Sequence, residues 1–233
     1  MSRKLAGWVA LSQAFVTPAL FMASFSFSQT EGLSSYFGSV DKSQDLSGVR
    51  FHGSFSEALE LRVHTSSILS APLILIVMSS AFSLLRNGSF LTTFFRAIGG
   101  SISGTFLFHL IFVLFGAPLI DAWAKTLAFS LYLSTLAAVP MSCIMGGDVV
   151  GWVRIVSCSE VNNRVEMVAY VAFAAAILGA WVGAFPIPLD WDEPWQTWPI
   201  SCVAGATIVQ SVGLLGLAMF LLVGRDAKAD KAD

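Results

Sequence analysis

The chain has 233 residues, of which 55% are hydrophobic and only 12% are charged, and its mean hydropathy is +0.74. A soluble domain carries about 25% charged residues, and a disordered chain combines low hydrophobicity with high charge, so the composition excludes both classes. The net charge of −2 offers no basic excess for neutralising phosphates, so we do not expect a nucleic-acid partner.

Six apolar segments are each long enough for a helix to cross a hydrocarbon core about 30 Å thick. They are residues 5–27, 65–85, 100–120, 126–147, 167–187 and 200–223. None of them contains Asp, Glu, Lys or Arg, and their apolar residues run continuously rather than alternating as in a membrane β-barrel. The predicted fold class is therefore all-α: a polytopic membrane helix bundle of about six transmembrane helices, forming a single membrane domain over residues 1–233.

Lysine and arginine are distributed unequally between the two sets of connections. Nine lie in the N-terminus, the 86–99 and 148–166 connections and the C-terminal tail, whereas four lie in the 28–64, 121–125 and 188–199 connections. Because positive residues are retained on the cytosolic side, both termini are predicted to be cytosolic. The sequon Asn87-Gly88-Ser89 is then cytosolic and unmodified.

The first segment has a second interpretation, because Arg3 and Lys4 before an apolar run also resemble the start of a signal peptide. It is longer than the usual apolar region of about 7–15 residues, so we expect it to be retained as a span. The 28–64 connection is polar and rich in Ser and Gly, and is predicted to be a lumenal loop with a short amphipathic helix near residues 55–61. Prolines at positions 18, 72, 118 and 140 predict kinks.

Ionisable groups inside a bilayer are costly, so His109, in the middle of the third segment, is a candidate functional residue. It could relay protons or contact a lipid headgroup. The alternative is a neutral imidazole hydrogen-bonded to another helix, for example to Ser134 or Thr135. Asp121 and Lys125, four residues apart, would face each other on a continuing helix as a structural pair, or Asp121 could contact a substrate or lipid.

The densest acidic group, Asp190, Asp192 and Glu193, lies between the fifth and sixth segments. Oxygen ligands so close together could bind a divalent cation, but no His or Cys accompanies them, and we expect no metal site. The surrounding prolines exclude a regular helix, and the tryptophans suit the headgroup region. We expect a rigid lumenal loop that serves as a structural or partner-docking edge. Its candidate residues are Pro186, Pro188, Asp190, Trp191, Trp195 and Trp198.

The fifth segment carries a face of small residues, which allow helix backbones to approach closely in lipid. Gly179 and Gly183 form a G-x-x-x-G motif beside Ala176 and Ala180. This face could pack within the chain or receive a helix of another protein.

Three runs, residues 108–119, 179–191 and 194–202, are similar to motifs of the phosphatidylinositol-glycan biosynthesis class F (PIG-F) family. Shorter matches occur at residues 133–135, 139–140 and 152–154, and the resemblance covers about residues 106–210. Gly116 and Pro118 lie in the first run, and we add them to the helix-packing or partner-binding candidates.

The resemblance implies a non-catalytic subunit of the endoplasmic reticulum membrane that stabilises the ethanolamine phosphate transferases of GPI-anchor assembly. The implied partners are the class O protein, acting on the third mannose, and the class G protein, acting on the second. No cofactor is expected in this chain, because the metals of these transferases belong to the catalytic partner. The alternative function is a lipid-handling enzyme or flippase-like carrier, with membrane lipid as its substrate. His109, Asp121 and the Asp190–Glu193 group would be its working residues.

Overall fold

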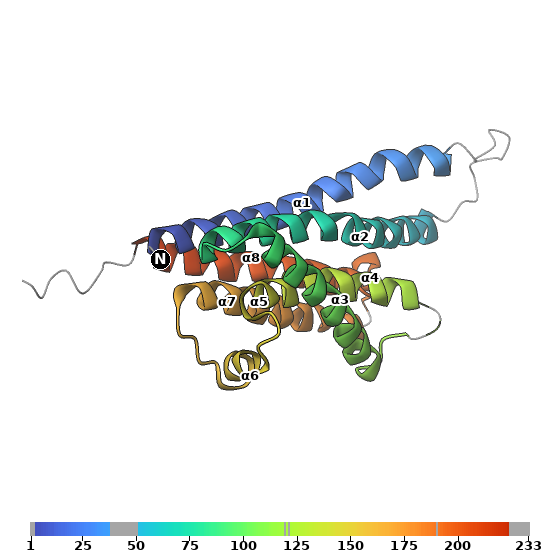
Figure 1. Cartoon of the computed structure of the whole chain (residues 1–233). Helices are drawn as coiled ribbons and strands as arrows, with labels where there is room; N and C mark the ends of the chain where they lie inside the picture. Colours follow the sequence, from blue (N-terminus) through green and yellow to red (C-terminus); the bar gives the residue numbers. More distant parts are fainter. Residues whose placement is uncertain (1–2, 38–50, 119, 121, 190, 224–233) are drawn as a thin grey trace, which may run out of the picture.

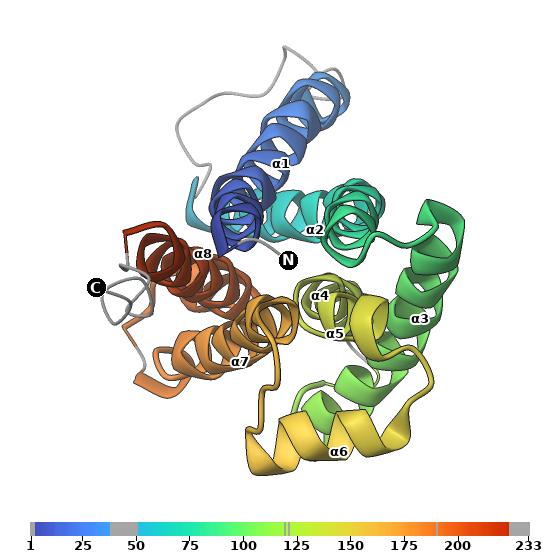
Figure 2. The same cartoon turned by 60° about the vertical axis from the view of Figure 1, so that its left-hand side comes forward.

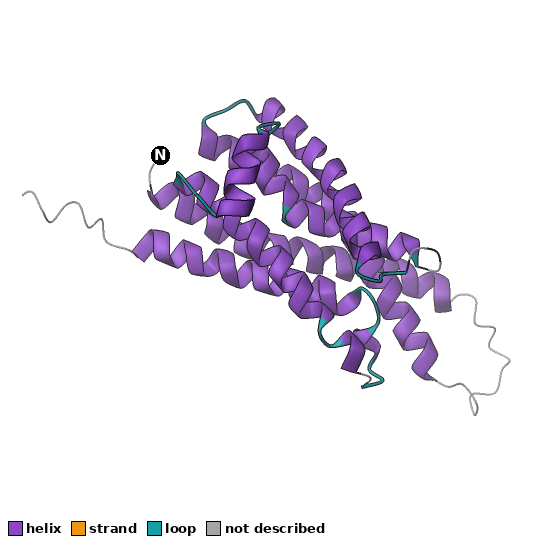
Figure 3. Ribbon diagram, turned by 90° about the horizontal axis from the view of Figure 1, so that it is seen from below, coloured by secondary structure: helices purple, strands orange, loops and turns teal. Residues whose placement is uncertain are grey.

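The computed structural model describes residues 3–37, 51–118, 120, 122–189 and 191–223 (Figure 1). All regular structure in these ranges is helical (Figure 3). The helices are α1 (Arg3–Phe37), α2 (Phe51–Arg86), α3 (Phe90–Leu114), α4 (Trp123–Leu136), α5 (Ala138–Met145), α6 (Val149–Cys158), α7 (Arg164–Ala184) and α8 (Ile200–Val223). Two 3₁₀ turns, η1 (Ile187–Leu189) and η2 (Pro194–Gln196), lie between α7 and α8. Five described helices are long and apolar enough to span a membrane, or six if the bent pair α4–α5 is one span, so the prediction of a polytopic membrane helix bundle is confirmed.

The bent pair α4–α5 lies at the centre of the bundle, and α2, α3, α7 and α8 pack around it (Figure 2). Every residue of α4 and α5 from Ala128 to Cys143 is buried, apart from the half-buried Leu131. The buried hydroxyl groups of this stretch donate to backbone carbonyls, as Ser130, Ser134 and Thr135 do, so the pair can occupy a central position without exposed polar groups. The largest contacts between long helices join α7 with α8, α1 with α8 and α1 with α2.

The start of α1 and the end of α8 lie at the same end of the bundle, because a Cβ on Gly7 would meet the side chain of Leu222. We call this the α5 end; it also contains the 87–89 turn, the C-terminus of α5 and α6. We call the opposite end, with the described residues of 115–122 and 185–199, the loop end.

Three predicted boundaries differ from the structure. The described residues 28–37 and 51–64 of the predicted lumenal loop are helical, because α1 and α2 continue beyond their apolar segments; residues 38–50 lie outside the described ranges. The segment predicted near residues 55–61 is part of α2. The third span begins at Phe90 instead of residue 100 and ends at Leu114. It therefore contains Arg96, which lies outside the uncharged segment 100–120 predicted from the sequence. A span can include such a residue near its end, because a long arginine side chain can reach the interface.

The fourth predicted span is broken at Ala137, where α4 and α5 meet at 45°. Pro140 has no N–H to donate to the carbonyl of Leu136, four residues earlier, which leaves that carbonyl without its helical donor. Gln210 of α8 supplies the missing donor: its Nε2 lies 2.8 Å from Leu136 O and 3.3 Å from Ala172 O of α7. The break is thus stabilised by a buried side chain from another helix. Pro18 and Pro72, by contrast, lie inside continuous helices.

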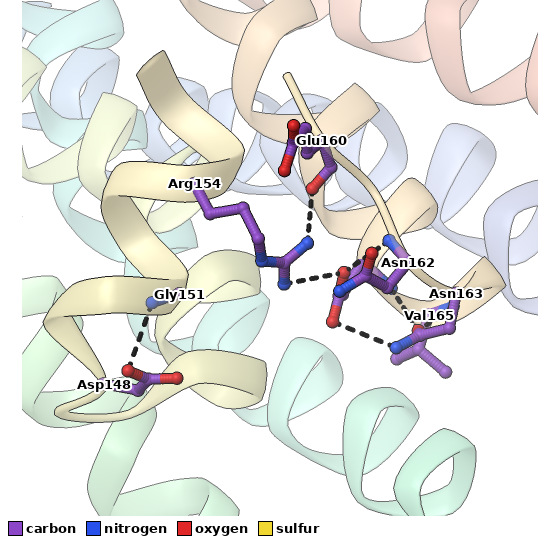
Figure 4. A network of polar contacts seen from close by, with 8 residues as sticks. Asp148, Gly151, Arg154, Glu160, Asn162, Asn163 and Val165 are labelled. Atoms are coloured by element: carbon purple, nitrogen blue, oxygen red, sulfur yellow. Dashed lines mark hydrogen bonds and ion pairs between the residues drawn. The ribbon is translucent and has the colours of Figure 1, made fainter. Parts of the chain in front are cut away.

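The predicted 148–166 connection contains a helix, α6, which is attached to α7 by the polar network of Figure 4. The buried carboxylate of Glu166 accepts from Arg154 Nη2 at 3.1 Å, from the backbone N–H of Asn162 at 2.8 Å and from Asn163 Nδ2 at 3.0 Å. Asn163 also caps α7, and Asp148 caps α6 through the N–H of Gly151. A buried carboxylate with this many donors is well compensated, so the network fixes α6 against the bundle.

Candidate functional site

The segment between α7 and α8, residues 185–199, is the connection in which the prolines and tryptophans singled out in the sequence lie. Its prolines interrupt regular helix formation, and the structure has only the 3₁₀ turns η1 and η2 there among the described residues. We call residues 185–199 the tryptophan loop, after Trp191, Trp195 and Trp198.

Gln196 holds the tryptophan loop together from within. Its Nε2 donates to the carbonyl of Pro186 at 2.7 Å, and its Oε1 accepts from the backbone N–H groups of Trp191 at 3.2 Å and Glu193 at 3.1 Å. The side chain is buried, so these bonds replace water for backbone groups that no regular helix satisfies. Sequence reasoning missed this residue. The sequence signal that could have identified Gln196 is that it is the one amide side chain within a run rich in proline and tryptophan.

Trp198 anchors the loop to the bundle. Its Nε1–H donates to Oγ1 of Thr126 on α4 at 3.1 Å, and its ring packs edge-on against Phe112 and Phe129 at centroid distances of 5.7 and 5.5 Å. Such edge-to-face contacts are favourable for aromatic pairs. The half-buried Trp198 is therefore a packing residue rather than an exposed residue of the headgroup region.

The other two tryptophans point outward. Trp191 is 56% exposed and Trp195 38%, and their rings lie 5.9 Å apart. Trp181 and Phe185, at the end of α7, are also exposed. Gln196 and Trp198 thus position an outward-facing aromatic edge at the loop end of the bundle. Of the two prolines that precede this edge in the chain, Pro186 is half-buried and Pro188 is exposed.

The acidic group of the loop is described only in part, because Asp190 lies outside the described residues. Asp192 and Glu193 are exposed, and Asp192 has a positive φ of 56°. Within the described ranges, no three His, Cys, Asp or Glu side chains are grouped so that they could hold a metal ion.

Gly179 and Gly183 lie where α7 crosses α8. A Cβ on Gly179 would come within 2.3 Å of the Gly205 carbonyl oxygen, and one on Gly183 within 2.3 Å of the Ser201 oxygen. Ala176 and Ala180 are buried in the same packing core. The small-residue face is thus occupied by a helix of its own chain, which explains why glycine is required there.

Gly116 and Pro118 follow α3 at the loop end, and both are exposed. Gly116 adopts a φ of +99°, which favours glycine, and no atom lies within 4 Å of the position of an added Cβ. The bend after α3 leads into the described residues before α4, where the Pro118 carbonyl lies 3.4 Å from Thr126 Oγ1.

His109 does not have the hydroxyl partners that its sequence environment suggested. Ser134 donates to the Ser101 carbonyl of α3 at 2.9 Å, and Thr135 to the Tyr132 carbonyl at 2.7 Å. The half-buried His109 has no partner for its buried Nδ1 among the described residues. No described hydrogen bond or ion pair joins it to Asp192 or Glu193.

Asp121 lies outside the described residues, so its predicted pairing with Lys125 is not tested. Lys125 of α4 forms an ion pair with Glu60 of α2. The lysine thus joins two helices at the loop end, across a separation in sequence that helical spacing does not reveal.

Comparison with known proteins identifies the family. The model of the GPI biosynthesis protein family Pig-F matches residues 49–217. The chain belongs to this family. The resemblance to this family that the sequence showed in residues 108–119, 179–191 and 194–202 is therefore confirmed.

Two curated relatives, from Mus musculus and Homo sapiens, are each named GPI ethanolamine phosphate transferase, stabilizing subunit. Each is 46% identical over 110 residues, which are 47% of this chain and 50% of the relative. Glycosylphosphatidylinositol anchor biosynthesis protein 11 of Yarrowia lipolytica is 38% identical over 122 residues, 52% of this chain and 53% of the relative. The chain spans about half the length of the curated relatives it matches. No solved structure gives a significant match.

Proposed function

We propose that this Pig-F family chain is a non-catalytic subunit that stabilises GPI ethanolamine phosphate transferases in the membrane. The observation that carries the proposal is the 46% identity to two relatives named as the stabilizing subunit of that enzyme.

The finer parts of the proposal come from the family resemblance and the charge distribution. The partners would be the catalytic subunits of the class O and class G types, which would contribute the metals, and the complex would lie in the endoplasmic reticulum membrane. The α5 end would face the cytosol, since Lys4, Arg86, Arg96, Arg154 and Arg164 lie on the flanks of helices there. The tryptophan loop would then be lumenal.

The surface proposed for partner binding consists of residues that the helix packing leaves exposed. Because Gly179 and Gly183 pack against α8, we place the contact at the exposed pair Trp191 and Trp195 rather than at the small-residue face. Large aromatic side chains held rigidly lose little conformational freedom on binding, which makes them effective anchors.

A depletion experiment tests the function. Loss of the chain should lower the amount of the class O and class G subunits and leave GPI precursors without ethanolamine phosphate on the third and second mannoses. Mass spectrometry of the precursors and immunoblots of the partners measure both effects. Partners that remain abundant and fully active after depletion would contradict the proposal.

Co-purification with the transferases tests the surface. Trp191→Ala and Trp195→Ala should each weaken partner recovery while the chain remains folded. The matched control is Trp8→Ala, which removes a 61% exposed tryptophan at the α5 end. Equal recovery with all three variants would place the contact elsewhere.

The alternative, a lipid-handling enzyme or carrier, predicts a different pattern. Single substitutions of His109, Asp121 and Asp190 would then abolish activity while the complex stays assembled. The relatives' names favour the stabilising function, for which these three substitutions should leave transferase activity intact.

A further inference from the structure

Two arginines from different helices meet at the C-terminus of α5. Arg86, the last residue of α2, donates from Nη1 to the carbonyl oxygens of Ile144 at 2.6 Å and Cys143 at 3.3 Å. Arg96 of α3 lies over the next residues, since its Nε is 2.9 Å from the position that a Cβ on Gly146 would take. Both guanidinium groups therefore lie around one helix end, and we call Arg86 and Arg96 the arginine pair.

The carbonyls at this helix end are satisfied by the groups already present. The Met145 oxygen accepts from the N–H of Asp148 at 3.1 Å, and the Gly146 oxygen from Trp152 Nε1 at 3.1 Å. Arg86 uses one of its nitrogens for the remaining carbonyls. No described hydrogen bond uses the N–H groups of Arg96, although a guanidinium has five N–H donors.

Neither arginine of the pair forms an ion pair with an acidic side chain among the described residues. The ion pairs among the described residues are Lys125 with Glu60 and Arg154 with Glu166. Asp148, which follows α5, uses its carboxylate to cap α6. Arg96 is half-buried and lies six residues, about 9 Å, inside a helix that is long and apolar enough to cross the membrane. A cation at this depth is costly without an anionic partner.

We propose that the arginine pair binds the phosphate of an anionic glycerophospholipid in the adjacent leaflet. Guanidinium groups bind phosphate oxygens with paired N–H bonds, and two neighbouring positive charges that form no ion pair among the described residues favour a lipid with net negative charge over a zwitterionic one. The surroundings favour a lipid over a free phosphate ion, because Phe95 and Leu91 beside Arg96, and Val150 on α6, are exposed apolar side chains that acyl chains can cover. The site does not depend on the proposed transferase partner.

Native mass spectrometry of the purified full chain in neutral detergent tests the site. The probes are phosphatidylserine, phosphatidylcholine of the same acyl composition, and inorganic phosphate. Wild type should retain one phosphatidylserine more tightly than phosphatidylcholine. Arg96→Gln should weaken retention by roughly tenfold or more, as expected for the loss of charge-assisted hydrogen bonds. Arg96→Lys should restore part of it, since lysine keeps the charge but not the planar fork.

The matched control is Arg164→Gln, which removes an exposed arginine at the same end of the bundle and should leave retention unchanged. If Arg96→Gln does not fold, Arg86→Gln, at an exposed position, carries the same test. Three results would each overturn the proposal: unchanged phosphatidylserine retention in the folded arginine-pair variants, equal retention of the two lipids by wild type, or complete displacement of the lipid by millimolar inorganic phosphate.

Discussion

The crossing of α7 and α8 gives the sharpest prediction about stability. In Gly183→Ala, the new Cβ would lie 2.3 Å from the Ser201 oxygen and 2.8 Å from the Cα of Cys202. Ordinary contact begins near 3.4 Å, so the two helix backbones must separate by about 1 Å. Overpacking of this kind costs about 1–3 kcal/mol. For a chain of this size that lowers the melting temperature by roughly 2 to 12 °C.

A thiol-labelling assay can follow this opening directly. Cys202 is buried beside Gly183 and Cys143 is buried in the central pair, whereas Cys158 is exposed. In a Cys158→Ser background, a fluorescent maleimide should label the purified protein in detergent slowly. Gly183→Ala should increase the labelling rate of Cys202 and lower the midpoint of thermal unfolding.

Gly216→Ala is the matched control on α8, because nothing lies within 4 Å of its added Cβ. It should leave the protein unchanged or slightly more stable, since alanine favours a helix over glycine by about 1 kcal/mol. If Gly183→Ala melts and labels like wild type, or if Gly216→Ala is equally destabilising, close backbone contact is not the reason for glycine at position 183.

Three further predictions follow from single contacts. Gln210→Leu should lower the free energy of unfolding by about 1–2 kcal/mol. Pro140→Ala in the same chain should recover part of this loss, because alanine restores an N–H that can donate to the Leu136 carbonyl. Additive effects of the two substitutions in a double-mutant cycle would refute the coupling. Gln196→Ala should speed hydrogen exchange of the backbone amides of residues 191 and 193, and unchanged exchange would show that its side chain does not hold the loop. Glu60→Lys and Lys125→Glu should each destabilise the protein by about 1 kcal/mol or less. The variant with both substitutions should unfold thermally at a temperature closer to that of wild type. If its loss of stability equals the sum of the two single losses, the two side chains do not form an ion pair.

The small-residue face shows where prediction from sequence ended. The spacing of Gly179 and Gly183 correctly indicated a close helix crossing, because small residues on one face have that physical consequence whatever the neighbour is. It did not indicate the neighbour. That depends on which helix the tertiary fold brings against α7, and the structure shows α8.

The tryptophan loop shows the same division. Its prolines predicted an irregular segment, since proline lacks the N–H that a helix requires. Its three tryptophans looked equivalent in sequence, yet Trp198 is fixed against Thr126 of α4, which is 72 positions away, while Trp191 and Trp195 face outward. Gln196 was overlooked for the same reason, because its partners become neighbours only when the loop closes.

The sequence by itself determined the class of protein. The apolar segments, with every charge outside them, required a membrane helix bundle because the hydrocarbon core tolerates neither free backbone groups nor unpaired charges. The motif runs were sufficient to indicate the family. Only the tertiary structure decided which distant residues contact one another. Lys125 pairs with Glu60, Gln210 donates to the carbonyl freed by Pro140, and Arg86 and Arg96 meet at the end of α5. These contacts join residues far apart in the chain, and local spacing carries no information about which distant helices pack together.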